Sequence, residues 1–227
     1  MRGFLLASCP AAVWLVTAVQ ALIFILALKG WREKKTPLYL LTALVAFGLF
    51  YDPLIIALGK VLQAGPLYLP LSKARFVFHG GLIPLLFPIC AYALNFRKPW
   101  KTAVWVLTGV IIALGLAEGF ATVLESVEIA NVVRCRSAET TPGWADAVSM
   151  VLSFGTVIPL MLAGIAVWIR QKTPLLFLSG FLMFLFSALG PATGNTDLIF
   201  YISMFGEVGM ALFFLLYARF QSKKINI

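Results

Sequence analysis

The sequence predicts an all-α membrane protein, a single bundle of seven transmembrane helices, and three observations lead to this fold class. Of the 227 residues, 61% are hydrophobic and 12% are charged, about half the charged fraction of a typical soluble domain. Long apolar runs recur along the whole chain, and the mean hydropathy is +0.96. The polar segments between these runs are too short to form a soluble domain. We therefore expect one transmembrane domain over residues 1–227.

Seven segments reach or approach the roughly 20 apolar residues that a helix needs to cross a membrane. We predict these helices at residues 11–28, 37–59, 74–94, 102–124, 145–169, 174–189 and 196–220. Pro37 suits the start of the second helix, because the N–H that proline lacks would be unpaired in the first turn. The sixth segment is the shortest, so the helix count depends on it most. The longest polar stretch, residues 125–143, is expected to connect the fourth and fifth helices.

The distribution of basic residues predicts the orientation. The chain ends and loops that follow the first, third, fifth and seventh helices hold twelve of the 18 Lys and Arg residues, and the opposite side holds six. Loops with more Lys and Arg remain in the cytosol. We therefore place the N-terminus outside and the C-terminus in the cytosol. A bacterial inner membrane and an endoplasmic reticulum membrane remain equally compatible.

Several function classes are not favoured by the residues present. The net charge of +9 does not indicate a nucleic-acid partner, because the basic residues stand in short clusters between apolar runs. The chain has a single histidine and no intramembrane Cys–His grouping, so we predict no metal site. No glycine-rich phosphate loop and no helix 7 lysine for a retinal Schiff base are present, and we predict no cofactor. Membrane lipids are expected partners, and the oligomeric state is left open.

The three cysteines do not form a disulfide framework. Cys9 and Cys135 both fall on the predicted outer side and could form one disulfide. Cys90 lies deep in the third predicted helix, where a packing role is expected.

Four ionisable residues inside predicted helices are the main candidates for function, because burying such a group in a membrane costs a few kcal/mol. They are Asp52, His79, Glu118 and Glu207. At 1.5 Å per residue, Asp52 and Glu118 lie about 22 and 24 Å from the cytosolic starts of their helices. His79 and Glu207 lie roughly 8 and 16 Å below the outer ends of theirs. All four therefore share the outer half of the membrane, which predicts one polar pocket there.

Neighbouring residues extend this predicted pocket. Arg75 precedes His79 by four residues and Ser203 precedes Glu207 by four, so each pair shares a helix face. Tyr51 and Tyr201 could contribute aromatic walls. We therefore predict Asp52, Glu207 and His79 as catalytic residues. The predicted substrate-binding residues are Arg75, Glu118, Tyr51, Ser203 and Tyr201.

Structural roles remain alternatives for each charged residue. Asp52 could form an ion pair with Lys60 or Arg75 that joins two helices. Glu118 could lie at the membrane interface, His79 could hydrogen-bond between helices, and Glu207 could be structural.

The positions of two acids resemble a known family. Asp52, beside Tyr51 on the second helix, and Glu207 on the seventh occupy positions similar to those of the seven-helix membrane terpene cyclases of meroterpenoid and indole-terpenoid pathways. That family usually has Glu on helix 2 and Asp on helix 7, the reverse of this chain, and lacks the Arg75–His79 pair. The resemblance implies protonation of an epoxide or alkene in a prenylated substrate, which starts cyclisation.

The leading hypothesis is an integral membrane enzyme that performs acid/base chemistry on a lipidic or prenylated substrate. A carboxylic acid buried among apolar groups holds its proton near neutral pH and can act as a general acid. A seven-helix sensor that binds a hydrophobic small molecule is an alternative, although the cytosolic loops are short. A proton-coupled transporter or channel is a third, and it would need polar groups along the whole path, whereas the inner half is nearly uncharged.

Overall fold

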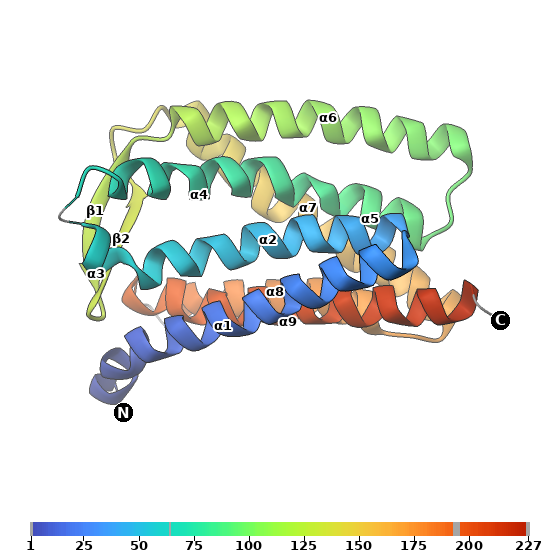
Figure 1. The fold of residues 1–227 in the computed structure, drawn as a ribbon. Helices are drawn as coiled ribbons and strands as arrows, with labels where there is room; N and C mark the ends of the chain where they lie inside the picture. Colours follow the sequence, from blue (N-terminus) through green and yellow to red (C-terminus); the bar gives the residue numbers. More distant parts are fainter. Residues whose placement is uncertain (1, 64, 193–195, 226–227) are drawn as a thin grey trace.

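The computed structural model describes residues 2–63, 65–192 and 196–225, and it is a bundle of long helices with one β-hairpin across an end (Figure 1). Within the described residues, six helices are long and apolar enough to cross a membrane. The chain is therefore an integral membrane protein with a helical bundle. These helices lie in α1 (Arg2–Lys34), α2 (Pro37–Ala57), α4 to α5 (Tyr68–Ala93), α6 (Lys98–Ala121), α7 (Gly143–Gln171) and α9 (Thr196–Ile225).

The sixth predicted segment is a helix, but its apolar part is shorter than the six helices above. It corresponds to α8 (Leu175–Ala192), whose apolar part, Leu175–Leu189, is below the length of the other spans. Helix α8 packs mainly against α7 and α9. Gly206 and Gly209 of α9 face α8, and a Cβ atom on Gly206 would lie 2.9 Å from Cβ of Phe186. These glycines therefore allow the two helices to approach closely.

The third predicted helix is longer than expected and is not continuous. It begins at Tyr68, six residues before the predicted start, and consists of α4 (Tyr68–Leu82), the 3₁₀ turn η1 (Ile83–Leu85) and α5 (Leu86–Ala93). Pro84 lies in the 3₁₀ turn and Pro88 in α5. Proline lacks the N–H that an α-helix needs, so a tighter turn replaces regular helix at this point.

The other helix bounds differ at the ends. Helix α1 extends through the charged residues to Lys34, where the prediction ended at residue 28, and α9 extends to Ile225 rather than residue 220. Lys, Arg and Glu favour helix and can extend toward water from the end of a span, so the helix continues beyond the apolar run.

Helices α4 and α6 approach each other at two glycines. A Cβ atom on Gly80 would collide with the backbone of Gly115, and one on Gly115 would collide with the backbone of Gly80. Contact between small residues allows close helix packing in membranes. On α4, Gly80 directly follows His79 and lies five residues after Arg75, so this crossing is next to both residues.

The polar stretch between α6 and α7 is a β-hairpin, where the sequence predicted only a connection. Strand β1 (Leu124–Ile129) pairs antiparallel with β2 (Val132–Ser137). Ala130 and Asn131 form the two-residue loop, and both have positive φ, as a type I′ hairpin turn requires. Strand β2 contacts α2, α3 (Gly59–Leu62) and α4. We call this end of the bundle the hairpin end and the other the far end.

The main apolar core extends from the middle of the bundle to the far end. Its largest fully buried side chains include Leu86, Leu160, Leu176, Phe214 and Tyr217. At the far end, Gln171 of α7 joins three elements: its Nε2 donates to the Ala93 carbonyl at 2.9 Å, and Tyr217 donates to its Oε1 at 3.2 Å. Hydrogen bonds of Gln171 therefore join α5, α7 and α9 at this end.

Candidate functional site

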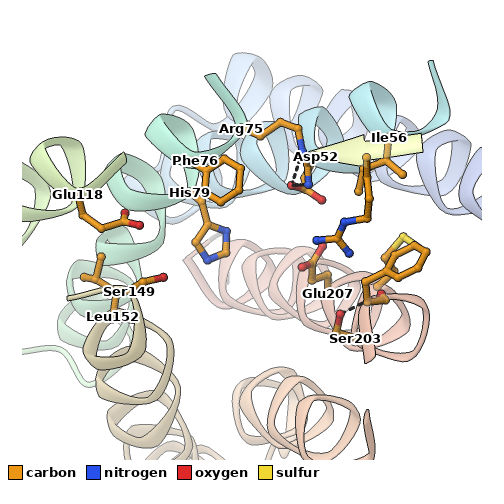
Figure 2. Close-up of a pocket in the computed structure, with 13 residues that line it drawn as sticks. Asp52, Ile56, Arg75, Phe76, His79, Glu118, Ser149, Leu152, Ser203 and Glu207 are labelled. Carbon is orange, nitrogen blue, oxygen red and sulfur yellow. Dashed lines mark hydrogen bonds and ion pairs between the residues drawn. The ribbon is translucent and has the colours of Figure 1, made fainter. Parts of the chain in front are cut away.

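A cavity of about 220 Å³ lies at the hairpin end, and we call it the polar chamber. Side chains from α2, α4, α6, β2, α7 and α9 line it. Its polar lining residues are Asp52, Arg75, His79, Glu118, Arg134, Ser149, Ser203 and Glu207. Figure 2 shows residues from these separate helices gathered around this space. Six of the eight predicted site residues thus line one cavity.

Asp52 and Arg75 form an ion pair in the chamber, in which Arg75 is buried and the Asp52 side chain is 26% exposed. Nε and Nη2 of Arg75 each lie 2.9 Å from Oδ1 of Asp52 (Figure 2). The Arg75 side chain is 5% exposed, and its Nη1 also donates to the Cys135 carbonyl of β2 at 3.3 Å. Arg75 therefore joins α2, α4 and the hairpin. Lys60, the other partner considered for Asp52, instead pairs with Glu128 of β1 at 3.4 Å.

Glu207 has no such partner. Its Oε2 atom is buried and makes no hydrogen bond within the described part of the chain. Ser203, one turn earlier on α9, lines the chamber beside it but donates to the Phe200 carbonyl at 3.0 Å. A buried polar atom without a partner costs free energy, so its retention needs an explanation such as a bound molecule or a catalytic role.

A second cavity of about 320 Å³ adjoins the first, and we call it the apolar chamber. It is lined mainly by apolar side chains of α2, α4 to α5, α7, α8 and α9. His79, Ser203 and Glu207 line both chambers and therefore form a shared boundary. The combined space falls within the roughly 300–1,000 Å³ common for small-molecule sites.

Part of the wall of the apolar chamber lies at the surface of the bundle. Phe154 of α7 and Phe184 of α8 line it and are also 53% and 38% exposed. Both residues belong to apolar helices whose exposed surfaces face lipid in a membrane. Residues of the chamber wall on α7 and α8 therefore reach the surface of the bundle that faces lipid.

Arg134 is a site residue that the sequence analysis missed. It lies on β2, lines the polar chamber, and holds its guanidinium 4.7 Å from the centre of the Phe200 ring. Burial lowers the pKa of Arg134 to about 10, the charge of Arg75 acts in the same direction, and Asp52 and Glu207 oppose the shift. The guanidinium therefore remains charged at neutral pH. Residues 127–133 are rich in β-branched side chains, apolar and polar residues alternate at 127–129, and Asn131 is a typical turn residue between two strands. This pattern could have predicted the strand that carries Arg134.

Glu118 is buried within the protein and 5% exposed. Thr122, one turn later on α6, donates to Oε1 of Glu118 at 3.2 Å, and Lys73 of α4 donates to the Thr122 carbonyl. Figure 2 shows Glu118 and Ser149 on one side of His79, with Asp52 and Glu207 on the other. Glu118 therefore lines a separate part of the chamber.

Two predicted substrate-binding residues lie in packing positions instead. Tyr51 donates to the Leu71 carbonyl at 3.1 Å and meets the Phe78 ring edge-on at 4.9 Å. Tyr201 packs edge-on against Phe205 at 5.4 Å. Neither residue lines the polar or the apolar chamber.

The cysteines that could have paired are both free. Cys9 is buried in an apolar cluster with Phe200, and Cys135 is buried in a different cluster with Tyr68. Cys90 packs against the main core, which agrees with its predicted packing role.

No protein-family model and no curated protein sequence matches the chain. The functional interpretation therefore depends on the residues of the two chambers.

Proposed function

We propose that the protein is an integral membrane enzyme that performs acid/base chemistry on a lipidic or prenylated substrate. The observation that supports this most is the place of Glu207 and His79 at the boundary between the polar and apolar chambers. A substrate with its apolar part in one chamber and its polar part in the other would present its reacting atoms to both residues. Proton transfer by positioned side chains accelerates reactions by about 10²- to 10⁴-fold.

In this proposal Glu207 is the acid that donates the proton, because its Oε2 has no partner among the described residues. His79 would accept the proton released at the end of the reaction. Asp52 is held by Arg75, so we assign it an electrostatic and positioning role. The resemblance to membrane terpene cyclases would make the substrate a prenylated epoxide or alkene, and both matching acids line the polar chamber.

The proposed topology has seven crossings, with α8 as the seventh, an external N-terminus and a cytosolic C-terminus. The excess of Lys and Arg at the far end supports this orientation. The hairpin end and both chambers would then lie in the outer half of the membrane. The apolar core of the far half favours an enzyme over a transporter, which would need a polar path across the bundle.

The test compares lipid extracts of membranes that contain the wild-type protein, Glu207→Gln or Glu128→Gln. Glu128 is the matched control, because it is a carboxylate exposed on β1 and paired with Lys60. We expect mass spectrometry to find a lipid that depends on the wild type and on Glu128→Gln and is lost in Glu207→Gln. Identical extracts from all three would contradict the enzyme proposal. A molecule that co-purifies unchanged with the wild type would support a sensor instead.

A further inference from the structure

We propose that the molecule bound by this site is an amphipathic anion, with a phosphate or carboxylate head on Arg134 in the polar chamber and an apolar chain in the apolar chamber. Calling this molecule the substrate rests on the proposed function. Its binding is a separate matter and can be measured without turnover.

The first reason is that Arg75 has ion-pair and hydrogen-bond partners in the polar chamber, whereas Arg134 has neither among the described residues. Arg75 is occupied by Asp52 and by the Cys135 carbonyl. Arg134 forms no ion pair within the described residues, and its buried Nε has no hydrogen-bond partner. Arg134 is half-buried, and a charged donor buried without an acceptor is costly, so an anion that enters the chamber and accepts from Nε would reduce this cost.

The second reason is the geometry of the Arg134 guanidinium. The Phe200 ring lies 4.7 Å from it, a favourable cation–π distance. The Phe200 ring supplies no carboxylate or carbonyl oxygen to the guanidinium, so its N–H donors remain available to an oxyanion. These donors are the groups that bind carboxylate or phosphate oxygens in pairs.

The third reason is that β2 is fixed in place. A Cβ atom on Gly59 of α3 would collide with the carbonyl of Val133, so backbone meets backbone directly before Arg134. Directly after it, the Cys135 carbonyl accepts a hydrogen bond from Arg75. Arg134 is therefore held by contacts on both sides, and an anion site at this position would be preformed.

The fourth reason is the apolar chamber itself. A free inorganic anion would use the polar chamber alone, whereas the two chambers meet at His79, Ser203 and Glu207. An amphipathic anion fills both and places the bond between head and chain at this boundary. Exposure of Phe154 and Phe184 on the surface that faces lipid suits a molecule that dissolves in the membrane.

The experiment measures equilibrium binding of dodecyl phosphate, dodecanol, dodecyltrimethylammonium and butyl phosphate to the full chain in a neutral maltoside detergent. We expect dodecyl phosphate to bind at least about tenfold more tightly than dodecanol or the cation, the effect of one charge-assisted hydrogen bond. Butyl phosphate, whose alkyl chain is much shorter, should also bind at least about tenfold more weakly than dodecyl phosphate, since each buried CH₂ contributes to binding. Equal binding of the anionic, neutral and cationic dodecyl probes would overturn the proposal.

Arg134→Gln and Arg136→Gln provide the matched pair of variants. Arg136 lies two residues further on β2, is half exposed and pairs with Glu125. We expect Arg134→Gln to remove the preference for dodecyl phosphate and Arg136→Gln to retain it. An equal loss of this preference in both variants would show that it arises from surface charge, and this would contradict the assigned site. Unchanged thermal unfolding would show that Arg134→Gln still folds, and Arg134→Lys should restore part of the preference.

Two outcomes separate this inference from the proposed function. If Glu207→Gln binds dodecyl phosphate as the wild type does, while no lipid product depends on the wild type, the anion site stands and the enzyme proposal fails. If a product depends on Glu207 but dodecyl phosphate shows no preference, the enzyme proposal stands and the anion site fails.

Discussion

Tyr217 and Glu207 lie ten residues apart on α9, yet their surroundings differ in kind. Tyr217, toward the far end, is 1% exposed, and its hydroxyl donates to Gln171, which in turn donates to the Ala93 carbonyl. Glu207, toward the hairpin end, faces two cavities and has a buried oxygen without a partner in the described residues. One helix therefore contains a polar group with hydrogen-bond partners and a polar group without them.

This difference separates structural from functional polarity. A satisfied network in a low-dielectric interior stabilises and positions the helices around it. A buried polar group that lacks a hydrogen-bond partner and lines a cavity lowers stability, and it remains available to bind a ligand or to react. Substitutions in the two halves should therefore have opposite effects on stability and activity.

The largest expected effect is that of Glu207→Gln on turnover. Loss of the proposed general acid should lower formation of the Glu207-dependent lipid by at least about 100-fold. Because Gln removes a carboxyl group that lacks a partner, the thermal unfolding midpoint should stay constant or rise. A falling midpoint together with retained turnover would place Glu207 with the structural residues.

Arg75→Met should cause the largest loss of stability. It leaves Asp52 without its partner, and removing one member of a buried ion pair costs about 3–5 kcal/mol. Denaturant unfolding in detergent measures the change, and the double variant with Asp52→Asn should recover part of it. Arg136→Met is the control, because its exposed pair with Glu125 should contribute less than about 1 kcal/mol.

Gly115→Ala should have an intermediate effect. The added Cβ would meet the backbone of Gly80, so α4 and α6 must separate, at a cost of about 1–3 kcal/mol. Gly109→Ala on the same helix is the control, since no atom beyond the neighbouring backbone of its own helix lies within 4 Å of the added Cβ. Equal unfolding midpoints for the two variants would show that the close crossing does not limit stability.

Tyr217→Phe should have the smallest effect of the four. It should lower stability and leave turnover unchanged, whereas Glu207→Gln should lower turnover and leave stability unchanged or higher. Loss of the hydroxyl breaks its hydrogen bond to Gln171 and should cost about 1 kcal/mol. Formation of the lipid product per folded molecule should not change. A large loss of turnover at constant stability would contradict the division between the two halves.

The sequence could predict the residues that helix geometry brings together. A fixed rise of about 1.5 Å per residue sets the level of Asp52, His79 and Glu207 within the bundle. Spacing of four residues put Arg75 beside His79 on one face. Tyr51 shows the limit of this approach: it is adjacent to Asp52 in sequence, but neighbours in a helix point about 100° apart, and Tyr51 packs against Phe78 instead.

Arg134 could not be placed in the same way. Its position depends on a two-stranded pairing and on contacts of β2 with Gly59 and Arg75, and these are far apart in sequence. The polar composition of 125–143 hid the strand pattern. Pro84 itself indicated an irregularity in the third helix. Whether a proline bends, tightens or ends a helix depends on the helices packed around it, so the sequence did not predict the 3₁₀ turn.

Phe154 and Phe184 line the apolar chamber and are also exposed on the surface of two apolar helices, where a molecule dissolved in the bilayer would enter. The effective concentration of a proposed substrate that enters from the bilayer is its amount per lipid molecule and not its amount per litre of buffer. Diluting vesicles would leave the occupancy of the site unchanged, whereas adding empty detergent micelles would slow the reaction at constant amounts of protein and substrate. For the proposed enzyme, the half-saturating amount of substrate would then be a mole fraction in the membrane.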